Sequence, residues 1–271
     1  MSDFAYPLHE ECGVFGIYDR AGTEDVAAAA YSALYALQHR GQESCGIAVN
    51  DDGVIQGHRD LGLVNEVFTP AVLGSLSTPT AHMATGHVRY ATAGQRSRSN
   101  AQPMVLHHCK GAMAVCHNGN LVNAPKLRRK LEMSGSIFHG TSDTEVIAYI
   151  VDYLHRKVGL SFEEIASVIA APFWQTIERM EPEKRRTHEY LRQVFASQLI
   201  TGPFSILVGF DGGLMALNDR LKLRSLVVGE KGSRVYFASE EAAIRRIEPA
   251  LERVWAPRGG EPVLVGLQQE R

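Results

Sequence analysis

The sequence has little of several features that mark common classes of protein. Its 271 residues include only four cysteines and no C-x-x-C pair, which argues against a disulfide scaffold and against a structural zinc or iron–sulfur site. The net charge of -2 indicates no general attraction to nucleic acid or to an anionic membrane. No apolar run approaches the length of a membrane span, and no nucleotide-binding G-x-G-x-x-G or G-x-x-x-x-G-K-S/T motif occurs.

The first eleven residues form a polar leader. They include Asp3, Glu10 and Glu11 and have neither the basic start nor the apolar run of a secretory signal. Together with the small number of cysteines, this predicts a cytoplasmic protein whose thiols are reduced.

Cys12 directly follows this leader and precedes the apolar residues Val14, Phe15 and Ile17, which are typical of a short buried strand. A thiol at the head of such a strand suggests a nucleophile that becomes exposed when residues 1–11 are removed. The alternative is that Cys12 is one more small buried hydrophobic residue, as most cysteines in soluble proteins are. This segment alone does not decide between the two.

The rest of the chain alternates short apolar strands with helices. Ala-rich and amphipathic patterns predict helices, and apolar runs next to Gly- or Asp-containing turns predict strands. The expected helices cover 25–38, 125–133 and 144–155; the expected strands cover 45–49, 54–55, 85–90, 113–116, 204–210, 213–217, 226–228, 235–238 and 262–267. Residues 64–79 are punctuated by prolines and are expected to be mobile. This pattern indicates an α+β fold with mainly antiparallel sheets.

A charged helical segment interrupts the strands near 155–200. Ser161 and Glu164 have the spacing of a capping box at the start of a helix. The segment is either a docking surface for a partner or a plain helical elaboration. With no repeat or low-complexity linker, the simplest division is a leader at 1–11 and one domain at 12–271.

Several motifs, taken together and in this order, resemble the glutaminase domain of class II glutamine amidotransferases, the N-terminal-nucleophile type. The motifs are Cys12-Gly13-Val14-Phe15-Gly16-Ile17, Leu37-Gln38-His39-Arg40-Gly41-Gln42, Gly86-His87-Val88-Arg89-Tyr90-Ala91-Thr92-Ala93-Gly94, His117-Asn118-Gly119-Asn120-Leu121 and Thr141-Ser142-Asp143-Thr144-Glu145. The first 150 residues most resemble the amidotransferase domain of amidophosphoribosyltransferase. The later part is more similar to stand-alone amidotransferase subunits of glutamate-synthase-type systems, although Arg224-Ser225 replaces the usual Arg-Pro. The resemblance implies a four-layer αββα sandwich.

The resemblance also implies a mechanism for Cys12. Its thiol is the expected nucleophile and its own α-amine the base, since a thiol pKa of about 8.5 and an α-amine pKa of about 7.7–8.0 suit proton exchange. While the leader is attached, that nitrogen is an amide and cannot take a proton. Asn118 and Gly119 are the expected oxyanion hole. The alternative for these two is a plain hairpin turn, because Asn-Gly is a strong hairpin signal.

Arg89 and Asp143 are the expected ligands of the two charged ends of the substrate. The Arg89 guanidinium suits the α-carboxylate of glutamine, and the Asp143 carboxylate suits the α-ammonium. The alternatives are a surface arginine at a strand end and a helix N-cap. Arg40, Gly41 and Thr92 are expected to border the same pocket.

The remaining candidate side chains are given structural roles. The histidines have no metal-ligand spacing and are read as structural or solvent-exposed, and the other three cysteines as packing residues. Asp219 and Arg224 are expected to hold the later strands together. The histidines in question are His87, His107, His108 and His117, and the cysteines are Cys45, Cys109 and Cys116.

Loop 92–100 is a candidate lid with Gly94 as hinge, or an ordinary exposed loop.

The sequence therefore predicts a glutaminase that needs no cofactor and no metal, and passes ammonia to a separate synthase subunit of the glutamate-synthase-like kind. One alternative is the glutaminase domain of a split or truncated amidophosphoribosyltransferase of purine synthesis. Another, from a different class, is a non-catalytic regulatory module that binds glutamine. The expected ligand is L-glutamine, with no nucleic acid and no membrane as partner.

Overall fold

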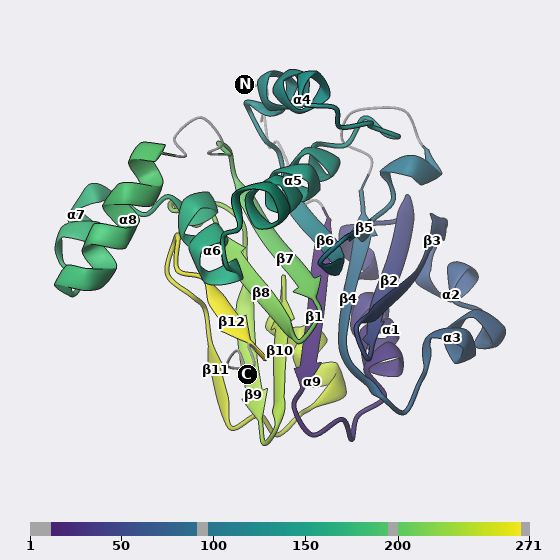
Figure 1. Ribbon diagram of the computed structural model, residues 1–271. Helices are drawn as coiled ribbons and strands as arrows, with labels where there is room; N and C mark the ends of the chain where they lie inside the picture. Colours follow the sequence, from purple (N-terminus) through teal and green to yellow (C-terminus); the bar gives the residue numbers. More distant parts are fainter. Residues whose placement is uncertain (1–11, 91–96, 195–199, 267–271) are drawn as a thin grey trace, which may run out of the picture.

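Two antiparallel β-sheets packed face to face form the centre of the molecule (Figure 1). The structure is a computed structural model that describes residues 12–90, 97–194 and 200–266. Helices cover the outer face of each sheet, so the layers follow the order α-β-β-α. The α+β class and the αββα sandwich expected above are thus confirmed.

The larger sheet has the strand order β11-β9-β10-β1-β4-β2-β3, and every pairing in it is antiparallel. Its strands are β1 (Gly13–Asp19), β2 (Ser44–Asp51), β3 (Val54–Leu61), β4 (Ala81–Arg89), β9 (Val227–Lys231), β10 (Arg234–Ala238) and β11 (Arg253–Trp255). Because Gly13 pairs with Val88, Cys12 lies beside Arg89 at the end of β4.

The smaller sheet has the order β12-β8-β7-β6-β5 and is also antiparallel. Its strands are β5 (Met104–His108), β6 (Gly111–Gly119), β7 (Phe204–Phe210), β8 (Gly213–Asn218) and β12 (Val263–Val265). Asn118 and Gly119 are the last residues of β6, where they pair with Ser205 and Phe204 of β7. They are part of a strand, so the hairpin-turn alternative is wrong.

Four helices cover the larger sheet: α1 (Val26–Ala36), α2 (Val64–Val67), α3 (Pro70–Leu76) and α9 (Glu241–Ile247), with η1 (Gln38–Arg40) after α1. Asp25 caps α1, since its carboxylate accepts hydrogen bonds from the amides of Ala27 and Ala28. Leu34 lies over Gly86 of β4, where a Cβ would stand 2.9 Å from the Leu34 side chain. The missing side chain lets α1 approach the strand closely.

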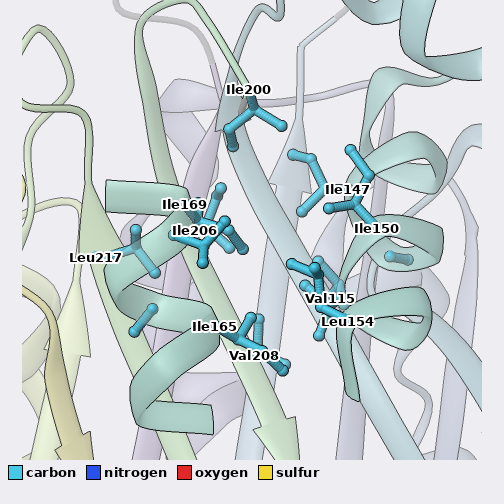
Figure 2. Close-up of a cluster of buried hydrophobic side chains, with 14 of the residues drawn as sticks. Val115, Ile147, Ile150, Leu154, Ile165, Ile169, Ile200, Ile206, Val208 and Leu217 are labelled. Atoms are coloured by element: carbon cyan, nitrogen blue, oxygen red, sulfur yellow. The ribbon is translucent and has the colours of Figure 1, made fainter. Parts of the chain in front are cut away.

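The helices over the smaller sheet are α4 (Ala124–Met133), α5 (Asp143–Asp152), the π-helical η3 (Tyr153–Val158), α6 (Phe162–Ala170) and α8 (Pro182–Val194), with α7 (Trp174–Glu178) between α6 and α8. Figure 2 shows Ile147, Ile150 and Leu154 of this layer facing the β6 and β7 side chains Val115 and Val208. The helices expected within 155–200 are present, and Ser161 and Glu164 form the predicted capping box.

The space between the sheets is filled by small and medium apolar side chains, among them Val14, Met83 and Leu207. Cys116 belongs to this cluster and Cys45 is buried under α1, which confirms both as packing residues. Burial raises the pKa of the Cys45 thiol to about 12. Cys109 is exposed in the turn between β5 and β6, so its assignment to the core is wrong.

The region 64–79 is also different from expectation, because it contains α2 and α3. Thr69 accepts a hydrogen bond from the amide of Val72, and Pro70 occupies the first turn, where its missing N–H costs nothing. The prolines therefore begin and end a short helix. The strands β5 and β11 and the helix α9 were not predicted. No helix in the described ranges is long and apolar enough to cross a membrane.

Candidate active site

One cavity of about 270 Å³ brings together Cys12, Arg89, Gly119 and Asp143, which come from four separate segments of the chain. Cavities of about 490 Å³ exist beside α7 and α8 and at the opposite end of the sandwich. Neither of these is lined by a thiol. The smaller cavity is therefore the candidate active site.

Cys12 is half-buried at the entrance to β1, with φ of 65°. This is the left-handed region, which a non-glycine residue adopts rarely and at a cost of about 1–3 kcal/mol. The Cys12 amide donates a hydrogen bond to the carbonyl of Arg40 (3.1 Å), and the amide of Tyr90 donates to the Cys12 Sγ (3.4 Å).

Arg40 holds the backbone of Cys12 through a side-chain hydrogen bond. Its guanidinium Nε donates to the Cys12 carbonyl (2.7 Å), and its Nη1 donates to Glu240 (2.8 Å), which also contacts His39 (2.9 Å). Burial would raise the pKa of the Glu240 carboxyl, but the hydrogen bonds from Arg40 and His39 outweigh burial and lower it. Arg40 thus fixes the backbone of the expected nucleophile, and its predicted contact with substrate stays a prediction.

Gly41 allows the loop after η1 to reach the end of β4. A Cβ at Gly41 would stand 2.6 Å from the backbone carbons of Val88 and Arg89. No other residue fits there without moving the strand. Gly41 therefore positions Arg89 through the backbone, and its bordering of substrate stays a prediction.

Arg89 is buried, not a surface arginine as the alternative proposed. Its Nη1 donates to the Glu43 carboxylate at 2.5 Å, and the Glu43 amide donates to the Arg89 carbonyl at 2.9 Å. Both side chains are at most 10% exposed. The pair neutralises a charge that would otherwise be buried alone, while Arg89 still lines the cavity.

Asn118 and Gly119 supply the expected oxyanion donors. The Asn118 Nδ2 is buried and has no hydrogen-bond partner among the described residues. Gly119 has φ of 152°, and a Cβ there would stand 2.1 Å from the carbonyl oxygen of Pro203. An unpaired buried donor is costly, and such groups are often found where a ligand atom binds.

Asp143 is the first residue of α5, and the helix N-cap is Ser142, whose hydroxyl accepts from the Thr144 amide. The expectation that Asp143 is the cap is therefore wrong. Its carboxylate instead accepts from the Leu121 amide at 2.8 Å and lies 3.4 Å from His117 Nδ1. Burial would raise the pKa of Asp143, but His117 and the Leu121 amide lower it, so the group is ionised at neutral pH.

Two buried side chains hold the loop before Asp143. The Asn100 Oδ1 accepts from the amides of Thr141 (2.8 Å) and Ser142 (3.1 Å). Glu145 accepts from the amides of His139 (2.8 Å) and Gly140 (2.9 Å). These bonds fix the direction in which Asp143 enters the cavity.

Several residues of this site were not predicted from the sequence. Gln102 lines the cavity, and its side-chain amide bonds the backbone N–H (2.7 Å) and C=O (3.2 Å) of His117, as a neighbouring strand would. Glu43 and Asn100 had no assigned role. No local pattern identifies them, because each acts on a residue far away in the chain. Thr92 and the expected hinge Gly94 lie outside the described residues.

The geometry suits attack by sulfur on a small zwitterionic substrate. A thiol, Gly119, one cation and one carboxylate line the same space, and the unpaired Nδ2 of Asn118 belongs to the residue before Gly119. Within the described ranges, no group of three His, Cys, Asp or Glu side chains could hold a metal ion.

Comparisons with known proteins identify the family of the chain. Residues 87–178 match the family model of the glutamine amidotransferase domain. The chain is 38% identical to amidophosphoribosyltransferase 2, chloroplastic, of Arabidopsis thaliana, over 97% of this chain and 40% of that protein. It is 34% identical to the amidophosphoribosyltransferase of Methanocaldococcus jannaschii, over 88% of this chain and 44% of that protein.

Among solved structures, the glutamine phosphoribosylpyrophosphate amidotransferase of B. subtilis, crystallised with ADP and GMP, superposes with a TM-score of 0.69 and 29% identity. The match covers 94% of this chain and 47% of that one. The chain thus spans less than half the length of these relatives. It is a class II glutamine amidotransferase domain of the N-terminal-nucleophile type, homologous to the glutaminase domain of the amidophosphoribosyltransferases.

Proposed function

We propose that this domain hydrolyses the side-chain amide of L-glutamine with the Cys12 thiol as nucleophile. The observation that carries the proposal is the cavity in which Cys12 meets Arg89, Asp143 and Gly119. A glutamine amidotransferase domain supplies the substrate class.

Recognition uses both charged ends of the amino acid. The Arg89 arms that Glu43 does not occupy bind the α-carboxylate, and the ionised Asp143 binds the α-ammonium. A simple amide lacks both groups and is rejected. The side-chain amide then extends toward Cys12 and the Asn118 Nδ2.

Hydrolysis proceeds in two steps. The α-amine of a processed Cys12 takes the thiol proton, and sulfur attacks the amide carbon, whose oxygen binds to Asn118 and Gly119. The C–N bond breaks, the amine gives its proton to the leaving ammonia, and a thioester remains. Water then attacks the thioester and releases glutamate and the thiol.

This chemistry requires removal of residues 1–11. In the unprocessed chain the Cys12 nitrogen is an amide, which has no basic lone pair, and it donates to the Arg40 carbonyl. After hydrolysis of the Glu11–Cys12 bond, the same carbonyl is placed to hold one N–H of the new amine. The left-handed φ of Cys12 supports processing, because cleavage removes the strained torsion.

The ammonia acceptor is proposed from the relatives. The relatives described above are amidophosphoribosyltransferases, so a phosphoribosyl-transferring unit is favoured over the glutamate-synthase-like partner expected from the sequence. A flavoprotein that co-purifies with this chain would instead favour the glutamate-synthase-like partner. The cytoplasmic location stays a prediction.

The test is the intact mass of the purified chain before and after treatment with an electrophilic glutamine analogue. We expect loss of residues 1–11 and addition of one label, with neither in Cys12→Ala. Cys109→Ala is the matched control, since it removes an exposed thiol and should still be labelled once. A processed chain that takes no label would contradict the proposal and favour a glutamine-binding module. Full glutaminase activity in a homogeneous uncleaved sample would contradict the processing step.

A further inference from the structure

His117 lies at the junction of the oxyanion strand and the carboxylate that faces the substrate. It directly precedes Asn118 in β6, and successive side chains of a strand point to opposite faces. Asn118 therefore points between the sheets while His117 points outward, under the first turn of α5. There its Nδ1 lies 3.4 Å from both the Asp143 carboxylate and the Thr144 hydroxyl.

The backbone of His117 is held on three sides. Gln102 bonds both its N–H and its C=O, and His87 Nε2 donates to the same carbonyl at 3.0 Å. The ring is 2% exposed. With its backbone held by these bonds and its side chain buried, His117 presents its ring atoms to the cavity in one fixed orientation.

The two ring nitrogens have different surroundings. Nδ1 faces an ionised carboxylate, so it carries the hydrogen. Nε2 is buried without a partner among the described residues and lies beside Gly119, whose absent Cβ would be 2.9 Å away. Among the described residues, one other donor from a neighbouring segment contacts the Asp143 carboxylate, the Leu121 amide. His117 therefore decides where the second carboxylate oxygen points.

We propose that His117 is a positioning residue for glutamine recognition, which acts by orienting the Asp143 carboxylate toward the substrate's ammonium through its Nδ1–H. This inference rests on the proposed glutaminase function. Hydrogen bonds of 3.4 Å are long, but active-site bonds of this length often shorten when substrate binds.

The experiment compares two amide substitutions. In His117→Asn the side-chain N–H₂ stands close to the position of Nδ1, whereas in His117→Gln it stands close to that of Nε2. We expect His117→Asn to keep the KM for glutamine within about threefold of wild type. We expect His117→Gln to raise this KM about tenfold, because it loses one hydrogen bond to a charged group. The kcat should change little in both variants. Exposed His107→Asn is the control for histidine loss and should match wild type.

Equal effects of the two amides on KM would overturn the inference, because a packing role does not distinguish the nitrogens. A fall in kcat at unchanged KM would overturn it as well, since that is the signature of a group acting on the reacting atoms. If either variant unfolds, glutamine binding to the other is compared with wild type by calorimetry. An unchanged affinity of His117→Gln for glutamine, or a tenfold loss of affinity in His117→Asn, overturns the inference. A wild-type chain without glutaminase activity would instead contradict the proposed function.

Discussion

Arg89 and Glu43 illustrate how a buried charge can be prepared for a ligand. The carboxylate of Glu43 accepts from Nη1 of the Arg89 guanidinium, and the proposed α-carboxylate of glutamine would bind to its remaining N–H groups. An arginine held in this way loses little side-chain entropy when the substrate binds. The planar fork is needed for this double use, because an ammonium cannot bond two carboxylates in fixed directions.

Arg89→Lys should therefore raise the KM for glutamine by about tenfold or more, the effect of losing one charged hydrogen bond. Steady-state kinetics on the processed chain measure it. Arg245→Lys, on the exposed face of α9, is the control and should have no effect. A KM within error of wild type would show that Arg89 serves only to pair with Glu43.

At the scale of the element, the end of β6 combines strand pairing with the proposed oxyanion hole. Val115 and Cys116 belong to the two cores on either side of the sheet, so the position of the strand is set by packing. The last residues, Asn118 and Gly119, continue the pairing with β7 into the cavity. Donors placed by a rigid strand need no reorganisation when the oxyanion forms.

Gly119→Ala should lower both stability and activity. The new Cβ would meet the Pro203 carbonyl at 2.1 Å, and the φ of 152° is also unfavourable for alanine. We expect a loss of at least about 1–3 kcal/mol in the free energy of unfolding, measured by denaturant titration. Gly111→Ala is the matched control at the other end of β6, since its φ is 126° but its Cβ would meet nothing within 4 Å. Equal losses in the two variants would mean that the collision with Pro203 is relieved without cost.

At the scale of the whole molecule, His87 links stability to pH. It is completely buried in β4 between the sheets and the site, and burial lowers the pKa of its imidazole to about 3. In the unfolded chain the pKa of His87 is about 6.5. At a pH between its folded and unfolded pKa values, the unfolded state therefore binds one more proton than the folded state. The contribution of neutral His87 to the free energy of unfolding is therefore complete above about pH 6.5, and it is lost as the pH falls below that value.

The free energy of unfolding should fall between pH 6.5 and 5 with a slope of up to about 1.4 kcal/mol per pH unit from this group. Denaturant titrations at several pH values measure it, and most carboxylates remain ionised in this window. His87→Asn is expected to reduce the slope, whatever its effect on stability at pH 8. A slope that is the same in the variant would assign the acid sensitivity to other histidines.

Local chemistry in the sequence was enough to predict most elements. The alternation and turn signals predicted β7 as it is found, and the capping box of Ser161 and Glu164 was identified because capping depends on residues three positions apart. The same local reasoning failed at 64–79, where prolines that suggested a mobile region begin a helix.

The sequence by itself determined the α+β class from apolar periodicity and the family from its motifs, because both are written locally, and the αββα layering followed from the family resemblance. Only the tertiary structure decided that Asn118-Gly119 is a strand end, that Ser142 and not Asp143 caps α5, and that Glu43, Gln102 and His117 support the site. The physical reason is that these roles are contacts between side chains and backbone far apart in the chain. Such contacts exist only once both sheets have packed together.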